Sequence, residues 1–193
     1  MMTLNKLFRI HLTTAVIVGA LALFSGCASY NLGSSAALPF ESIYIRPVAN
    51  DSFAPQAQAL LSAQLREAFI RDGRVKVLAN EADADAVLEV TLTDYRRRGA
   101  ARSSADTVVA QTFDLNLVAV TSLFSQNSGS FYFQNRPIQD ATTAYTENPY
   151  LPDGAPQTQG FQQSEYQAMT QLTRGLARKI ADEVLSPWEP RSR

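Results

Sequence analysis

Apolar and polar residues alternate along several short stretches of the chain. The alternation is clearest over residues 88–93, which read LEVTLT. Because successive side chains of a strand point to opposite faces, this pattern predicts a strand with one buried face. Shorter runs of the same kind predict further strands at residues 43–45, 75–78, 113–117 and from residue 131 onward.

Two longer segments instead repeat their apolar residues every three or four positions, the spacing of an amphipathic helix. The first runs from Ala57 to Phe69 and is expected to end near Gly73, since glycine readily takes the backbone conformation that ends a helix. The second begins at Gln163 or Ser164 and stops before Pro187.

The order strand, helix, several strands, helix predicts an α+β two-layer sandwich. We expect a roughly four-stranded mixed sheet, with both amphipathic helices packed on one of its faces. The opposite face would carry Glu89, Thr91, Asp114 and Asn116. It should therefore face water or a polar partner.

The N-terminus has a different pattern. Lys6 and Arg9 precede an apolar run over residues 12–24, which leads into Ser25-Gly26-Cys27. A basic start, an apolar middle and small residues before a cleavage point are typical of a signal peptide, and the cysteine marks the bacterial lipoprotein type. We expect cleavage before Cys27 and lipid attachment to its thiol. The alternative is an uncleaved transmembrane anchor, although the run is shorter than the ~20 residues of a spanning helix.

These features divide the chain into a signal peptide (1–26), a lipidated N-terminus and tether (27–41), one α/β sandwich domain (42–188) and a short tail (189–193). The residue after Cys27 is Ala28 rather than aspartate, which favours sorting to the outer membrane.

Composition narrows the possible chemistry. The chain has one cysteine, Cys27, and one histidine, His11, which lies in the signal peptide. The mature domain therefore lacks the residues of Cys/His zinc sites, Ser-His-Asp triads and Cys-His dyads. Carboxylate-only chemistry and a Ser-Lys pair remain open. A net charge of −1 gives no sign of nucleic-acid binding. We expect a protein that is not an enzyme and carries no cofactor besides its lipid.

Several motifs follow one another in an order that can be compared with known families. They are Gly26-Cys27, Tyr30-Asn31-Leu32-Gly33, Asn50-Asp51-Ser52, the strand 84–92 and the last helix with its apolar face. With these motifs, the chain resembles the lipopolysaccharide-assembly lipoprotein (LptE) family over nearly its whole mature length. The resemblance implies a domain that sits inside an LptD-like outer-membrane barrel, helps it assemble and helps pass lipopolysaccharide to the cell surface.

Four arginines form the first candidate contact site: Arg96, Arg97, Arg98 and Arg102. We place them at a strand end and in the loop beyond it. Lipopolysaccharide carries phosphates and carboxylates, which arginine binds with paired hydrogen bonds. We therefore hypothesise that the cluster touches lipopolysaccharide or the barrel rim; the alternative is a solvated basic turn.

Aromatic residues give further candidates. Tyr132 is expected to point outward from its strand, and Tyr150 lies in a long loop at residues 146–162. Exposed aromatic side chains often anchor interfaces, so both could contact the barrel. The alternatives are packing at the sheet edge for Tyr132 and a bystander loop for Tyr150.

Three neighbouring carboxylates, Glu81, Asp83 and Asp85, could in principle hold calcium or do acid–base work. The segment is short and lacks an EF-hand pattern, which favours a polar turn. A second function also stays open: another periplasmic lipoprotein that binds and regulates a cell-wall synthesis or secretion complex. The identity of the partner protein would distinguish the two.

Overall fold

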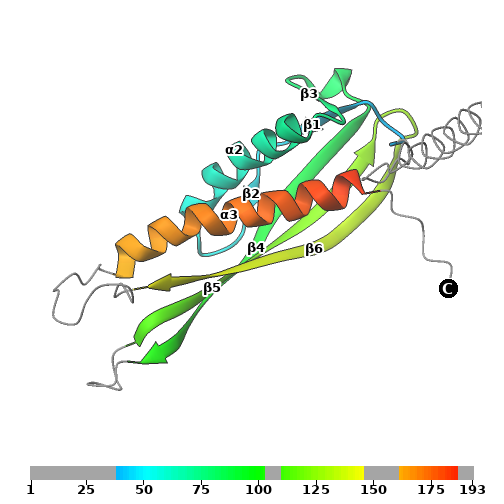
Figure 1. The fold of residues 1–193 in the computed structure, drawn as a ribbon. Helices are drawn as coiled ribbons and strands as arrows, with labels where there is room; N and C mark the ends of the chain where they lie inside the picture. The colour runs from blue at the N-terminus through cyan, green and yellow to red at the C-terminus, as the bar shows by residue number, and fades with distance from the viewer. Residues whose placement is uncertain (1–37, 103–109, 146–160, 187–193) are drawn as a thin grey trace, which may run out of the picture. The chain divides into compact units, whose positions relative to one another are not determined.

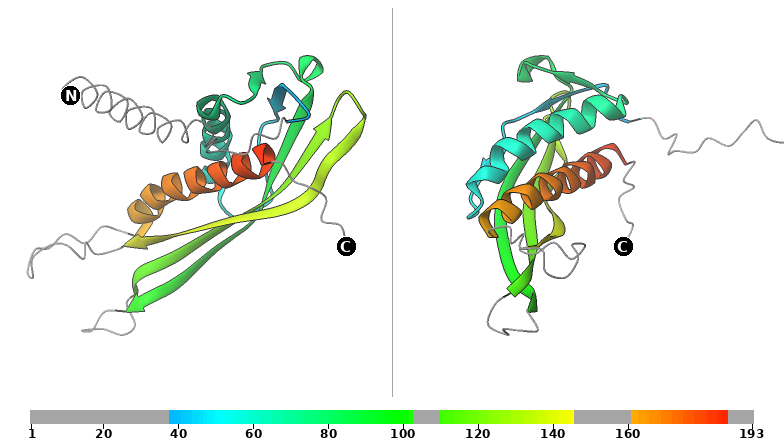
Figure 2. Two further views of the ribbon diagram at one scale, coloured as in Figure 1. Left: turned by 45° about the vertical axis from the view of Figure 1, so that its right-hand side comes forward. Right: turned by 60° about the vertical axis from the view of Figure 1, so that its left-hand side comes forward.

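The computed structural model describes residues 38–102, 110–145 and 161–186, which form a two-layer α+β domain (Figure 1). Its strands are β1 (Ser42–Ile45), β2 (Ala49–Asn50), β3 (Lys76–Leu78), β4 (Ala86–Arg102), β5 (Ala110–Ser125) and β6 (Ser130–Tyr145). Its two α-helices are α2 (Pro55–Asp72) and α3 (Phe161–Leu185). Both helices lie on the same face of the sheet in each view of Figure 2.

The sheet is mixed and runs in the order β3-β1-β4-β5-β6, with β2 also pairing with β4. The strands β1, β2 and β3 are short and parallel to their neighbours, whereas β4, β5 and β6 form a long antiparallel meander. The predicted two-layer plan is confirmed. The sheet holds six strands rather than roughly four, and the two-residue strand β2 is the one that no alternating run indicated.

The helix α2 forms where the apolar spacing predicted it. Ala57, Leu61, Leu65 and Phe69 are its buried residues, and they recur at four-residue intervals along one face. Gly73 ends the helix with a φ of 76°, and its backbone N–H donates to the carbonyl of Phe69. An L-residue with a side chain would be strained there, so glycine is the natural stop.

The core lies between the helices and the sheet. Its largest fully buried side chains include Phe69 of α2, Leu88 and Leu92 of β4, Leu117 of β5 and Leu172 of α3. One sheet face supplies all the strand residues of this set, as the alternation predicted.

The strand β4 is longer than its alternating sequence indicated. The strand was expected to end at the arginines 96–98, with a loop beyond them, but β4 continues to Arg102 and pairs with β5. A register shift between Leu92 and Asp94 marks a bulge at Thr93. One extra residue reverses which side chains face the helices, so the buried positions change from Leu88, Val90 and Leu92 to Tyr95.

Asp85 connects three segments that are distant in sequence. Its carboxylate accepts hydrogen bonds from the Ser42 hydroxyl (2.7 Å) and the Ser42 backbone N–H (3.0 Å) at the start of β1, and from Asn127 in the β5–β6 turn (3.2 Å). These bonds, above all the one from the Ser42 hydroxyl, hold the pKa of the Asp85 carboxyl below its usual value.

We therefore expect Asp85→Ala to lower the melting temperature at pH 7. A depressed pKa stabilises the folded state above the unfolded-state pKa near ~3.9, and this contribution is lost as pH falls through the folded-state value. The gap in melting temperature between the variant and the parent protein should close in strong acid. Asp51→Ala, at an exposed position, is the matched control; a gap of constant size from pH 7 to pH 2 would contradict the prediction.

Candidate interaction surface

The sheet face turned away from α2 and α3, here called the open face, carries polar residues from three strands. Because cross-strand partners share a face, the register places these polar residues there: Glu89, Thr91, Asp94, Arg96, Arg98, Asp114, Asn116, Gln139 and Thr143. The four positions expected from sequence on this face are among them. No described helix covers this face, so it is the largest candidate surface for a partner.

A shallow hollow of about 400 Å³ lies on the open face. Arg96 and Arg98 of β4 line one side, Asp114 and Asn116 of β5 the floor, and Thr143 of β6 the other side. The Thr143 hydroxyl donates to Asp114 (3.1 Å), which holds that carboxylate along the floor. The hollow therefore offers cationic and hydrogen-bonding groups beside the apolar surface of Leu115 and Ala141.

Two of the predicted arginines meet at this hollow. Arg96 Nε donates to the Asp94 carboxylate at 2.7 Å, yet its side chain stays 78% exposed. Arg98 stands opposite Asp114 in the β4–β5 register and makes no ion pair within the described residues. Both guanidinium groups are therefore accessible to an anionic partner.

Arg97 points to the other face of the sheet. Its guanidinium lies 3.5 Å from Glu165, a nearly buried carboxylate near the start of α3. The same carboxylate accepts a hydrogen bond from the Tyr95 hydroxyl. Burial first, and then this bond, raise the pKa of Tyr95. Arg97 thus belongs to a contact between β4 and α3, and the four-arginine cluster is divided between two faces.

The remaining predicted positions fall partly outside the described residues. Cys27 and Tyr150 lie outside them altogether, and Arg102 is described only as the last residue of β4. Their proposed roles stay predictions.

The aromatic run at the start of β6 is arranged differently from the expectation. Tyr132 is half-buried: its ring packs 5.5 Å from that of Phe40, and its hydroxyl donates to the Pro39 carbonyl (3.4 Å). Phe131 is the outward ring, 43% exposed, and packs edge-on against Phe124 of the open face. A register shift between Leu123 and Phe124 makes Tyr132 an extra residue in the pairing, which strict alternation did not foresee.

Sequence reasoning also missed Phe53, which is 94% exposed in the turn between β2 and α2. It directly follows the polar cluster Asn50-Asp51-Ser52. A large apolar residue directly after a polar cluster was the sequence feature that could have indicated an exposed ring.

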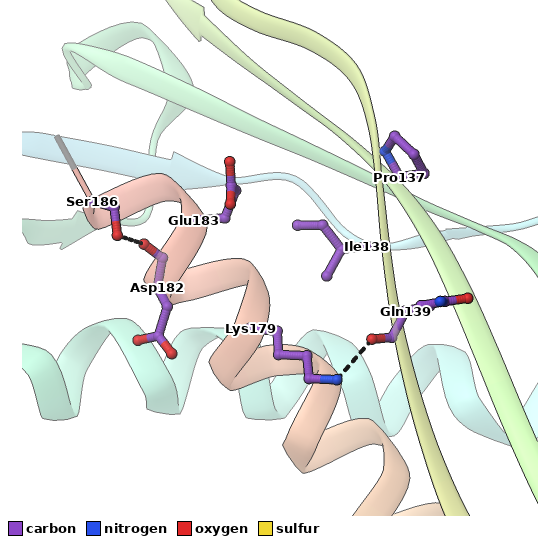
Figure 3. A pocket seen from close by; sticks show the side chains of 7 residues that line it. All are labelled: Pro137, Ile138, Gln139, Lys179, Asp182, Glu183 and Ser186. Carbon is purple, nitrogen blue, oxygen red and sulfur yellow. Dashed lines mark hydrogen bonds between the residues drawn. The ribbon is translucent and has the colours of Figure 1, made fainter. Parts of the chain in front are cut away.

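A second hollow, of about 410 Å³, lies between β6 and the C-terminal half of α3 (Figure 3). Lys179 Nζ donates to the Gln139 carbonyl (2.9 Å) and pairs with Asp140 (2.7 Å). Glu183 pairs with Arg136. These four charged side chains pair with one another across the hollow. They therefore hold α3 against β6.

The three neighbouring carboxylates of the sequence each bind a group within the domain. Glu81 pairs with Arg46, Asp83 accepts from Asn80 (2.9 Å), and Asp85 binds β1 and the β5–β6 turn. Across residues 38–102, 110–145 and 161–186, no group of three His, Cys, Asp or Glu residues could hold a metal ion. Neither described α-helix has the length and apolar character needed to cross a membrane.

Several solved structures are similar to this chain. A protein of Chlamydia trachomatis matches with a TM-score of 0.51 and 11% identity over 75% of this chain and 95% of its own. A minor lipoprotein of Acinetobacter baumannii matches with a TM-score of 0.46 and 15% identity, over 76% and 94% respectively. Lipoprotein B of Nitrosomonas europaea matches with a TM-score of 0.44 and 17% identity, over 76% and 85%. At 11% identity, the likeness to the Chlamydia trachomatis protein concerns the fold alone.

No curated protein matches the chain. The model of the LptE family, described as lipopolysaccharide-assembly, matches residues 40–184, which take in every described strand and nearly all of α3. This confirms the resemblance seen in the sequence. The chain belongs to LptE, the lipopolysaccharide-assembly family, whose members are lipoproteins without enzymatic activity.

Proposed function

We propose that this protein is an outer-membrane lipoprotein, anchored by lipid on Cys27, that plugs an LptD-like barrel. In this role it helps the barrel assemble and helps pass lipopolysaccharide to the cell surface. The family match over residues 40–184 carries the proposal.

The open face supports a role inside a barrel. The interior of an outer-membrane barrel is polar, and a plug needs a polar surface that can meet it. The open face offers carboxylates, amides, hydroxyls and the two accessible arginines Arg96 and Arg98 over three long strands. A permanent complex of this kind would bury roughly 2,000 Å² or more, and a meander with strands of 16 or 17 residues is long enough to supply much of it.

The test is a detergent pull-down of the tagged full-length protein from its native envelope, with partners identified by mass spectrometry. Recovery of one large outer-membrane barrel in equal amount would support the proposal. Recovery of periplasmic cell-wall synthases or secretion subunits in its place would overturn it and favour a regulatory lipoprotein of the same fold.

The arginines of the open face give a sharper prediction about lipopolysaccharide. Each charge-assisted hydrogen bond from Arg96 or Arg98 to a phosphate or carboxylate could contribute ~1.5–3 kcal/mol. The double variant Arg96→Ala/Arg98→Ala should therefore weaken lipopolysaccharide binding by at least about tenfold, measured by titration of the purified protein at low salt.

Arg97→Ala is the matched control, since Arg97 faces α3 and pairs with Glu165. It removes one positive charge from the same strand, half of what the double variant removes, and should leave lipopolysaccharide binding much less affected than either single variant, Arg96→Ala or Arg98→Ala. Equal losses from Arg97→Ala and the single variants would mean that general positive charge, and not the open face, attracts the ligand. Unchanged binding of the double variant would remove the arginines from the contact altogether.

A further inference from the structure

Phe53 is the most exposed large apolar side chain among the described residues, at 94%. It lies in the turn where the chain leaves β2 and enters α2, between the exposed Asp51 and the fully buried Ala54. A ring held this far into solvent gains nothing from the core of its own domain.

The turn is held in place by hydrogen bonds on both sides of the ring. Asn50 Oδ1 accepts from the Ser52 backbone N–H (2.9 Å) and hydroxyl (2.7 Å), and Asn50 Nδ2 donates to the Ala54 carbonyl (3.1 Å). The Asp51 N–H donates to the Leu92 carbonyl of β4 (2.8 Å), which ties the turn to the sheet. The exposure of Phe53 therefore comes from a defined backbone.

The local sequence also denies Phe53 its usual intramolecular partner. An apolar residue just before a helix cap commonly packs on the fourth residue of the helix. Ala54 is the cap of α2, so that fourth residue is Gln58. Its side chain instead donates to the Val48 carbonyl (2.8 Å) and offers no apolar surface. The turn thus combines a fixed backbone with an apolar side chain that has nothing to pack against.

We infer that Phe53 is an anchor that inserts into an apolar pocket of a partner protein. Its backbone is already ordered, so binding would restrict little beyond the ring itself. Burial of a phenylalanine ring favours association by about 10- to 100-fold. The pocket should also place a donor or a cation near Asp51, the exposed carboxylate two residues away.

A lipid surface fits this turn less well than a protein does. Aromatic residues that bind bilayers are usually accompanied by lysine or arginine, which attract anionic headgroups. Residues 47–65 contain no basic residue and one acidic residue, Asp51. The turn therefore lacks the charge that would hold it on a membrane.

The inference rests on the proposed function only for the identity of the partner protein. Photocrosslinking in the native envelope tests whether Phe53 enters a pocket of that partner. The full-length protein would carry p-benzoylphenylalanine in place of Phe53, or of Ile70 as a matched position. Ile70 lies on α2 and is 67% exposed. We expect a single protein adduct from position 53, with the crosslinked residue mapped by mass spectrometry to an apolar pocket, and little adduct from position 70.

The variant Phe53→Ala completes the test. The complex recovered from the envelope should fall by about tenfold or more, while the melting temperature of the isolated protein stays the same, because the ring touches no core residue. Adducts to lipid alone, adducts within the same chain, or an unchanged yield of complex would overturn the inference. An adduct to a pocket in a protein other than an outer-membrane barrel, with the same loss of that complex, would support the anchor and overturn the proposed function.

Discussion

Replacing Leu172 with alanine is expected to lower the free energy of unfolding by about 2–5 kcal/mol, the range found for leucine truncations in packed cores. Leu172 is fully buried on the face of α3 that packs against the sheet, together with Met169 and Leu176. The truncation removes apolar contact area and leaves a cavity that a helix packed along its length cannot easily close. Urea unfolding of the mature protein at pH 7 measures the effect.

The neighbouring variant Gln171→Ala is the matched control, because Gln171 is exposed on the same helix. It changes the helix by one residue of similar propensity and should shift stability by no more than about 0.5 kcal/mol. A loss below about 1 kcal/mol for Leu172→Ala would contradict the close packing of α3 on the sheet.

The helices and the layer order were predictable from sequence because their causes are local. The spacing of Ala57, Leu61, Leu65 and Phe69 places these residues on one side of α2 without reference to the rest of the chain. The backbone freedom of Gly73 likewise acts at its own position. The strand at residues 88–93 was equally evident, since its alternation reflects burial on one face only.

The extent of the long meander was not predictable in the same way. The strand was expected to end at the arginines 96–98, because three arginines and a glycine show no alternation. They form a strand since β5 supplies a complete pairing partner, as Arg98 opposite Asp114 illustrates. Such pairing depends on residues far along the chain, and no local pattern reports it.

Bulges set the faces of individual side chains, and this limited what could be predicted about the candidate site. The extra residue at Thr93 directs Arg97 toward α3 and leaves Arg96 and Arg98 on the open face. A similar irregularity in β6 buries half of Tyr132 and turns Phe131 outward. The sequence therefore indicated a cationic region but could not divide it between two surfaces.

The second large effect is expected at Cys27. In the variant Cys27→Ser, labelled palmitate should no longer be incorporated, and the protein should disappear from the outer-membrane fraction. Serine has no thiol, so the acylation that precedes cleavage of a lipoprotein signal cannot take place. Each buried methylene contributes about 0.8 kcal/mol, and a single acyl chain gives only marginal binding. Loss of two or three chains would remove the anchor entirely.

Ser29→Ala is the matched control, since it alters the same segment two residues away and leaves the thiol in place. It should retain palmitate and its place in the outer membrane. The competing hypothesis, an uncleaved transmembrane anchor, predicts that Cys27→Ser keeps both its molecular mass and its membrane location. Residues 12–24 are fewer than the ~20 that a membrane-spanning helix needs. We therefore expect Cys27→Ser to lose its location in the outer membrane. The lipid, and not the apolar run, would then hold the domain where its open face can meet a barrel.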